Sequence, residues 1–175
     1  MKHLIFAVLT TAIIFSCSEK KEKTAGAGSE NKYTRDQTYS ATFAGDFTQD
    51  VSDADVHAVM MSYKEWENGD MSKVEGYYAD SVMWENTQGE KLMMTRADLM
   101  KRWGTFRDSL SSVVIKMDAW DRAYDTLKKA GFVLTWYREY DTYKTGKVDS
   151  ADYQDVNQVN NGKISYFSQY KRPIK

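Results

Sequence analysis

The sequence is poor in the residues that cross-link small domains or bind metals. It has one cysteine, Cys17, and two histidines, His3 and His57, in 175 residues. A single cysteine excludes an intramolecular disulfide, so packing must hold the folded part together. His57 has no cysteine or histidine partner in the body of the chain, which excludes a zinc site. Its place in the first turn of a predicted helix also indicates an exposed side chain rather than a catalytic base.

Motifs for phosphate groups and nucleic acids are also missing. The sequence has no glycine-rich phosphate loop and no nucleophile elbow, so no cofactor is indicated. Lysine and arginine number 24 against 25 acidic residues, and they form no basic stripe. Nucleic-acid binding therefore has no electrostatic basis.

A long hydrophobic run occurs once, at the N-terminus. This run, residues 4–15, is about a dozen residues long, well short of the ~20 residues that a membrane-spanning helix needs. The run follows a basic start and ends in Ile14-Phe15-Ser16-Cys17. This segment resembles the signal peptide and lipobox of a bacterial lipoprotein. The resemblance implies removal of residues 1–16 and acylation of Cys17, with palmitate among the chains. A plain secretory signal, which leaves a free thiol, is the alternative.

Residues 17–50 are expected to be the lipidated cysteine and a flexible tether. Lysine, glycine and serine are frequent in residues 18–37, and almost nothing large and apolar precedes Tyr33. Such a stretch cannot bury enough surface to offset its ordering entropy. Ser18, rather than aspartate, follows the cysteine, which resembles lipoproteins released to the outer membrane. We therefore expect a lipid-anchored protein of the cell envelope, in the outer membrane of a Gram-negative bacterium.

Helix signals fill the first half of residues 51–175, a length that suits one domain with a single core. Ser52 with Asp55, and Thr95 with Asp98, form capping patterns ahead of apolar residues at helical spacing. The predicted elements are a helix over 52–68 closed by Gly69, a short helix through 74–78 capped by Asp70, a strand over 81–85 and a helix over 95–110.

Strand signals fill the second half. From Ser112 onward, runs of β-branched and aromatic residues alternate with turn signals. Asn160-Asn161-Gly162 predicts a hairpin, because the primed turns need positive φ. Helices followed by hairpin-joined strands indicate an α+β fold, with helices on one face of a curved antiparallel sheet. The predicted strands cover 113–117, 132–143, 149–159 and 163–170, with Pro173 beyond the last.

Several short segments carry a family resemblance when they are taken in order. They are Trp66-Glu67-Asn68-Gly69-Asp70, residues 77–84, Gly89, the helix start at 95–99, and Asn161-Gly162-Lys163-Ile164. Together they resemble the SnoaL-like type of the nuclear transport factor 2-like superfamily over residues 52–172. The resemblance implies a cone-shaped fold in which three N-terminal helices and a bent sheet enclose a pocket. It also implies a homodimer through the sheet, as in many members, but no particular reaction.

Family members that catalyse, such as ketosteroid isomerases, offer three positions for comparison. Their general base falls on Asn86, an amide that cannot abstract a proton, and the neighbouring Glu85 is expected to face the other way. Their hydrogen-bonding tyrosine falls on Ser62, with Tyr63 one position, or 100° of helix, away. Their acid on the penultimate strand matches Asp155.

The orientation of Asp155 decides what it can do. Alternation places Tyr153, Asp155 and Asn157 on one face of the predicted strand. If this face lines the pocket, burial favours the neutral carboxyl, which can donate a hydrogen bond to a ligand oxygen. In the alternative, Asp155 faces solvent or pairs with an arginine such as Arg138. On the preceding strand, alternation separates two faces without telling which one is the dimer surface.

Two functions from different classes remain. We favour a lipoprotein domain that binds a small apolar ligand or a protein partner without catalysis. The alternative is an isomerase, cyclase or dehydratase that acts on a small hydrophobic substrate by acid/base chemistry. It requires two candidate side chains within hydrogen-bond reach of one ligand position. The candidate catalytic residues are Asp155, Glu85 and Tyr63, and the candidate ligand-binding residues are Asp155, Asn157, Tyr153, Trp84, Asn86 and Trp103.

Overall fold

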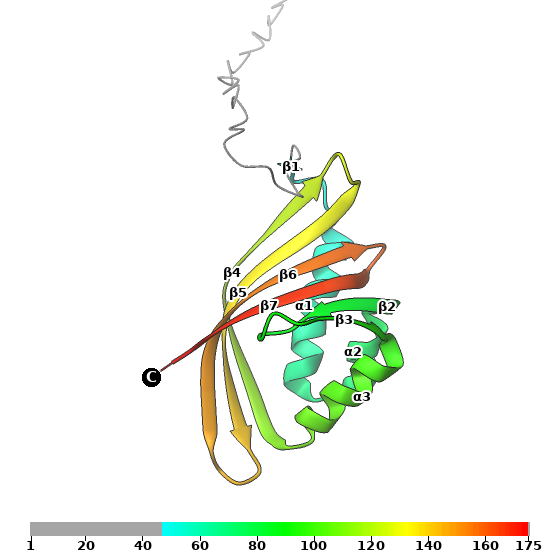
Figure 1. Ribbon diagram of the computed structural model, residues 1–175. Coiled ribbons are helices and arrows are strands. Elements are labelled where there is room, and N and C mark those ends of the chain that lie inside the picture. The colour runs from blue at the N-terminus through cyan, green and yellow to red at the C-terminus, as the bar shows by residue number, and fades with distance from the viewer. Residues whose placement is uncertain (1–46, 175) are drawn as a thin grey trace, which may run out of the picture. The chain divides into compact units, whose positions relative to one another are not determined.

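The computed structural model describes residues 47–174 (Figure 1). The predicted signal peptide, Cys17 and most of the predicted tether lie outside the described residues. The helices are α1 (Asp53–Asn68), α2 (Met71–Gly76) and α3 (Arg96–Arg107). The strands are β1 (Phe47–Thr48), β2 (Tyr78–Glu85), β3 (Lys91–Thr95), β4 (Leu110–Asp125), β5 (Ala130–Tyr143), β6 (Val148–Asn160) and β7 (Lys163–Pro173). Within residues 47–174, none of the helices has the length and apolar character needed to cross a membrane.

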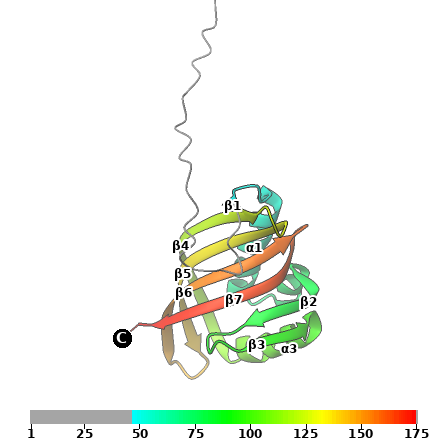
Figure 2. The ribbon, with the colours of Figure 1, turned by 45° about the horizontal axis from the view of Figure 1, so that its top comes forward.

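The strands form one sheet, in the order β1-β4-β5-β6-β7-β2-β3. Strands β4 to β7 pair as an antiparallel meander, and the last hairpin turns at Asn161 and Gly162, both with positive φ. Strand β2 pairs with β7 in parallel, so one pairing departs from the expected antiparallel pattern. Figures 1 and 2 show the long strands bending around the helices. The predicted α+β class, with helices on one face of a curved sheet, is confirmed.

The helix starts follow the predicted capping patterns. The Ser52 hydroxyl accepts a hydrogen bond from Asp55 N at 3.1 Å, and the Thr95 hydroxyl accepts one from Asp98 N at 3.1 Å. Asp70 caps α2 in the same way, with its carboxylate accepting from the backbone of α2. These contacts are local in sequence, which is why the sequence predicts them well.

Hydrogen bonds hold the C-terminal ends of α1 and α3 together. Helix α1 ends at Gly69, whose φ of 78° is in the left-handed region. Arg107, the last residue of α3, donates from Nε to Trp66 O at 3.0 Å and from Nη2 to Glu67 O at 3.1 Å. The guanidinium therefore satisfies carbonyl groups that a helix end leaves free, and it sets the position of α3 beside α1.

Several strands are longer than the sequence predicts. Strand β2 begins at Tyr78 rather than at residue 81, so the short helix predicted through 74–78 ends instead at Gly76. Strand β4 covers Leu110–Asp125 rather than 113–117, and it passes a bulge between Met117 and Ala119. The polar segment after Met117 is a strand because it pairs with β5. The local sequence does not reveal a pairing with a distant strand, so it does not predict this extension. Strand β7 extends to Pro173, at a strand end where a missing N–H is tolerated. Strands β1 and β3 have no counterpart among the predicted elements.

The two faces of the sheet differ in burial. On β5, the concave face towards the helices carries side chains that are at most 8% exposed, namely Val133, Thr135, Tyr137, Glu139 and Asp141. The convex face carries the partly exposed Leu134, Trp136, Arg138 and Tyr140. Tyr153, Asp155 and Asn157 of β6 are buried on the concave face, as alternation predicts. No described element covers the convex face, which is the face that the expected homodimer requires; the homodimer itself stays a prediction.

The core lies between the helices and the concave face. Val59 of α1, Val82 of β2, Leu99 of α3, Val133 of β5 and Ile164 of β7 are each 0% exposed. Burial of such a side chain is worth ~1.5–3 kcal/mol relative to leaving it in water. This core occupies part of the concave space, and the rest of that space is a cavity.

Candidate functional site

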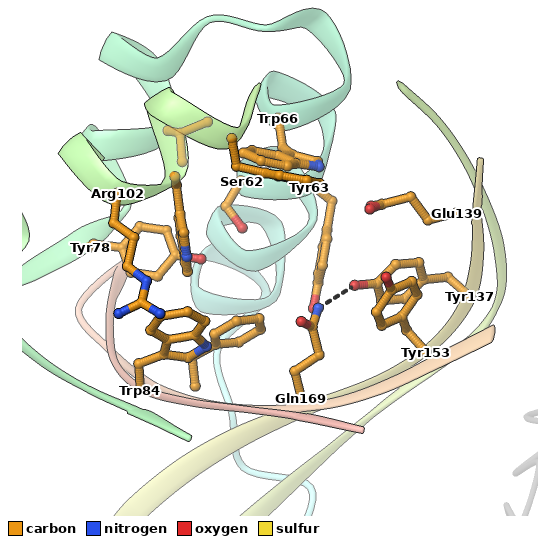
Figure 3. Close-up of a pocket in the computed structure, with 14 residues that line it drawn as sticks. Ser62, Tyr63, Trp66, Tyr78, Trp84, Arg102, Tyr137, Glu139, Tyr153 and Gln169 are labelled. Carbon is orange, nitrogen blue, oxygen red and sulfur yellow. Dashed lines mark hydrogen bonds between the residues drawn. The ribbon is translucent and has the colours of Figure 1, made fainter. Parts of the chain in front are cut away.

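A cavity of about 320 Å³ lies between α1, α3 and the concave face of the sheet (Figure 3). This volume is at the lower end of the range for small-molecule sites, ~300–1,000 Å³. One wall is apolar and largely aromatic, and the other is polar. The apolar wall consists of Trp66, Val74, Tyr78, Trp84, Trp103, Phe106 and Phe167, and the remaining lining residues are Ser62, Tyr63, Arg102, Tyr137, Glu139, Tyr153 and Gln169.

Trp103 of α3 is the centre of the aromatic wall. Its ring centroid lies 5.3 Å from that of Tyr78, 5.6 Å from Phe167, 6.0 Å from Trp84 and 6.4 Å from Trp66. All four contacts are edge-to-face, the arrangement that the charge distribution of aromatic rings favours. Because the partners come from α1, β2 and β7, this one side chain joins α3 to the rest of the cavity wall.

The polar wall is built around Asp155. The Tyr63 hydroxyl donates to Asp155 Oδ2 at 2.8 Å, and the Tyr137 hydroxyl donates to the same oxygen at 2.9 Å. Tyr63 comes from α1, Tyr137 from β5 and Asp155 from β6, so three elements meet at this oxygen. Asp155 is 0% exposed and lies behind the two tyrosines, which line the cavity.

Neighbouring polar groups hold the two tyrosines in place. The Tyr63 hydroxyl lies 2.9 Å from Thr135 Oγ1 and accepts from Asn157 Nδ2 at 3.1 Å. The Tyr137 hydroxyl accepts from Gln169 Nε2 at 3.2 Å, a contact drawn in Figure 3. Positions so constrained keep the hydroxyls at fixed points of the cavity wall.

Burial raises the pKa of Asp155 from the ordinary 3.8 to about 7, because an ionised carboxylate is poorly solvated there. Hydrogen bonds from Tyr63, Tyr137 and Gln169 act in the opposite direction and limit the rise. Within residues 47–174, Asp155 Oδ1 is buried without a hydrogen-bond partner. The carboxyl is therefore poised to gain or lose a proton near neutral pH.

Protonation of Asp155 changes which group donates. The carboxylate accepts from both tyrosines, whereas the neutral carboxyl donates its own proton to one of them. That tyrosine can then turn its O–H towards the cavity, which Tyr63 and Tyr137 both line. Asp155 therefore reaches a bound molecule through the tyrosines, as the source of a hydrogen bond to an oxygen of that molecule.

A second buried acid, Glu139, also lines the cavity. Glu139 is 8% exposed and its neighbour on the same face, Asp141, is 6% exposed. Burial, followed by repulsion from Asp141, raises the pKa of Glu139 to about 8, and burial also raises the pKa of Asp141. No sequence motif assigns a role to either acid. The signal that points to them is their alternation with Tyr137 on the buried face of β5.

The structure brings several predicted site residues together. Tyr63 and Asp155 meet directly. Trp84, Trp103 and Tyr153 line the cavity. Asn157 is 1% exposed and reaches the cavity through its hydrogen bond to Tyr63.

Glu85 lies on the opposite, convex side of the sheet from this group. Its carboxylate accepts from the Tyr166 hydroxyl at 2.9 Å and lies 3.6 Å from Lys91 Nζ. Trp84, one residue earlier, lines the cavity. The alternation of side chains along a strand therefore keeps Glu85 out of the cavity, as the sequence analysis expects.

Asn86 and His57 also lie away from the cavity. Asn86 is 4% exposed, but its Oδ1 accepts from Gln88 N and Glu90 N, both at 3.0 Å, so the amide serves the loop between β2 and β3. His57 is exposed near the start of α1, as predicted. Neither side chain is among the lining residues.

Two alternatives from the sequence analysis are settled by geometry. Ser62, at the position of the family tyrosine, donates to Val59 O at 2.7 Å within α1, while Tyr63 makes the contact with Asp155. Arg138 donates to Asp152 Oδ1 at 2.7 Å on the convex face and does not pair with Asp155. Among residues 47–174, no group of three or more metal-ligating side chains is clustered.

Solved structures share the fold at low sequence identity. An LEH-like epoxide hydrolase from M. tuberculosis is 16% identical with a TM-score of 0.57, over 68% of this chain and 83% of that chain. AusH from Aspergillus nidulans is 12% identical with a TM-score of 0.56, over 71% and 88%. An NTF2-like protein of unknown function from Exiguobacterium sp. 255-15 is 12% identical with a TM-score of 0.55, over 66% and 98%. At these identities the likeness shows the fold alone.

A comparison with curated proteins finds no match. The SnoaL-like domain family matches residues 59–167, which is more than half of the chain. This match runs from within α1 to within β7 and includes every residue that lines the cavity except Gln169. The chain therefore belongs to the SnoaL-like domain family, and it has the nuclear transport factor 2-like fold.

Proposed function

We propose that this domain binds a small, mainly apolar molecule in the cavity and holds an oxygen of that molecule with the Tyr63 or Tyr137 hydroxyl. The observation that carries the proposal is the union of an aromatic wall with a buried Tyr63–Asp155–Tyr137 cluster. The apolar wall favours the body of the ligand, and the few fixed polar groups orient it.

Acid/base catalysis is a second candidate, and the Tyr63–Asp155 contact of 2.8 Å favours it. Isomerases, cyclases and dehydratases develop negative charge on a substrate oxygen. A tyrosine O–H backed by a neutral Asp155 can stabilise that charge in a cavity with mainly apolar walls. The fold is compatible with chemistry on a small molecule, since one structural neighbour is an epoxide hydrolase.

The ketone 2-acetylnaphthalene tests both candidates, because it has an apolar body and a single oxygen acceptor. We expect binding that quenches tryptophan fluorescence and weakens as the pH rises through about 7, where Asp155 ionises and recaptures the tyrosine protons. Loss of one neutral hydrogen bond costs ~0.5–1.5 kcal/mol, so Tyr63→Phe or Tyr137→Phe is expected to weaken binding about 2- to 13-fold.

Tyr140→Phe is the matched control, since Tyr140 lies on the convex face, where the ammonium of Lys116 is 5.2 Å from the centre of its ring. Equal losses in all three variants, or no binding by the unmodified protein, contradict the proposal. The same samples in D₂O separate the candidates. If deuterium enters the methyl group of the ketone faster with the protein than without it, the result favours catalysis. Binding with no such acceleration favours the non-catalytic function.

We also propose that Cys17 carries lipid and anchors the protein in the cell envelope, in the outer membrane. The support is the lipobox-like segment and Ser18 after the cysteine. For the full chain expressed in a Gram-negative host, we expect incorporation of labelled palmitate and fractionation with outer membranes. Cys17→Ser is expected to abolish both, while Ser16→Ala, which keeps a small residue before the cysteine, leaves them intact. A labelled Cys17→Ser protein contradicts the proposal.

A further inference from the structure

Glu139 is a buried acid that faces the open cavity without a basic partner. Figure 3 shows its carboxyl pointing from β5 towards Trp66 and Tyr63. Within residues 47–174, no lysine, arginine or histidine forms an ion pair with Glu139. Buried carboxyl groups are usually paired with a cation or hold a proton. The absence of a cationic partner on a cavity wall indicates that the partner can come from outside.

Asp141, the acid next to Glu139 on the same face of β5, makes this part of the cavity more favourable for a positive charge. Burial and then repulsion from Asp141 raise the pKa of Glu139 to about 8, and burial also raises the pKa of Asp141, so the pair holds a proton at neutral pH. Asp141 Oδ1 is buried without a partner among the described residues. Asp155 adds a third carboxyl group on the same face of the sheet. When no ligand is bound, a proton therefore neutralises the Glu139–Asp141 pair. A bound cation can replace this proton.

Aromatic side chains line the cavity beside Glu139 (Figure 3). The rings of Tyr63 and Tyr137 are 5.1 Å apart, and Tyr137 stacks on Tyr153 at 5.3 Å. Trp66 lies close enough to Glu139 to lower the pKa of its carboxyl, and it lines the same cavity. Faces of such rings attract an organic cation, most strongly where water is excluded.

The basic groups of the region lie at its edges and leave Glu139 itself free for a ligand. Arg102 of α3 lies over Trp84 at 4.9 Å, and Figure 3 shows it on the opposite side of the cavity from Glu139. Arg107 donates to two α1 carbonyls, and Lys171 of β7 lies over Tyr153 at 5.5 Å. The charged and titratable groups that interact with the Glu139–Asp141 pair are Asp155, Asp149, Lys171, Arg107, Tyr137, Tyr143 and Tyr153.

From this arrangement we infer that the ligand carries a positively charged nitrogen, as in an organic amine with an apolar body, and that this nitrogen lies against Glu139 among the rings of Tyr63, Trp66, Tyr137 and Tyr153. The inference rests on the proposed function, because the same cavity holds the ligand. A metal ion is disfavoured, since hard cations take six or more oxygen ligands and aromatic rings supply none. An amine instead uses both the carboxyl and the rings.

Benzyltrimethylammonium is a suitable probe, because its charge does not change with pH. We expect it to bind at pH 9 at least about tenfold more tightly than at pH 6, since Glu139 loses its proton over this range. At pH 7 each probe that binds is expected to displace up to about one proton, measured by calorimetry in buffers of different ionisation enthalpy. Neutral 2-acetylnaphthalene is expected to displace none at this end of the cavity.

Glu139→Gln is expected to abolish the preference of the ammonium probe for high pH and the proton release that accompanies its binding. Glu85→Gln is the matched control, because Glu85 lies on the convex face, and it should leave both effects intact. If the ketone binds and the ammonium probe does not, or binds without proton release, the amine inference is overturned and the proposed function stands. If neither probe binds, both the amine inference and the proposed function are wrong. Proton release by the unmodified protein tests the inference even if Glu139→Gln does not fold.

Discussion

Raising the pH from 5 to 8 is expected to lower the free energy of unfolding by about 2–3 kcal/mol through Asp155 alone. The pKa of this carboxyl is about 7 in the folded protein and 3.8 in ordinary surroundings. Between these values the folded state holds a proton that the unfolded state has lost. Stability is therefore fully present below pH 4 and is lost as the pH rises through 7. Glu139, whose pKa is raised to about 8, acts in the same direction.

Other carboxylates act outside this window. Hydrogen bonds from Arg138 and Arg172 lower the pKa of Asp152 to about 2, so its contribution is lost only as the pH falls below 4. Urea unfolding at pH 5, 6, 7 and 8 therefore isolates the buried acids. The direction is unusual, because many domains are most stable between pH 5 and 8 and lose stability in acid.

Asp155→Asn is the variant that assigns the effect. It keeps an oxygen acceptor for the two tyrosine hydroxyls but cannot ionise, so the loss of stability between pH 5 and 8 should shrink by about 2–3 kcal/mol. Asp118→Asn, at an exposed position in β4, is the control and should follow the unmodified protein. Parallel curves for Asp155→Asn and the unmodified protein would show that the buried cluster does not titrate as described.

The parts of the fold that the sequence predicts are those with local causes. Ser52, Thr95 and Asp70 cap helices through contacts three residues away, and Asn161-Gly162 makes a turn between adjacent strands. The extension of β4 beyond Met117 depends instead on pairing with β5, which lies elsewhere in the chain. Long-range pairing of this kind overrides local propensity, so the strand predicted from the sequence ends at Met117.

In the candidate site, too, the sequence predicts the features with local causes and misses those set by packing. Alternation along β6 suffices to place Tyr153, Asp155 and Asn157 on one buried face. The choice between Ser62 and Tyr63 depends on how α1 rotates against the sheet, which is set by packing. The role of Glu139 requires knowing that β5 faces the cavity at this point and that no base in residues 47–174 pairs with it. Neither fact has a signature in the local sequence.

Truncation of Trp103 is expected to destabilise the domain by about 3 kcal/mol, at the lower end of the range for removal of a large aromatic side chain. Its ring contacts those of Trp66, Tyr78, Trp84 and Phe167, which belong to three other elements. Trp103→Ala therefore removes packing between α3 and the rest of the fold, and it also removes a wall of the cavity. Binding of 2-acetylnaphthalene should fall even where the variant is fully folded.

Two companion variants test whether the aromatic cluster itself is responsible. Trp103→Phe keeps a ring among the same partners and should retain most of the stability in urea unfolding. Trp120→Ala removes the same side chain from a site on β4 where it is 47% exposed, and the expected loss is below about 1 kcal/mol. Equal losses for Trp103→Ala and Trp120→Ala would mean that α3 is held by the Arg107 contacts to α1 rather than by the ring cluster. Because α3 forms one side of the cavity, that result would also mean that Trp103 lines the binding site without fixing the position of α3.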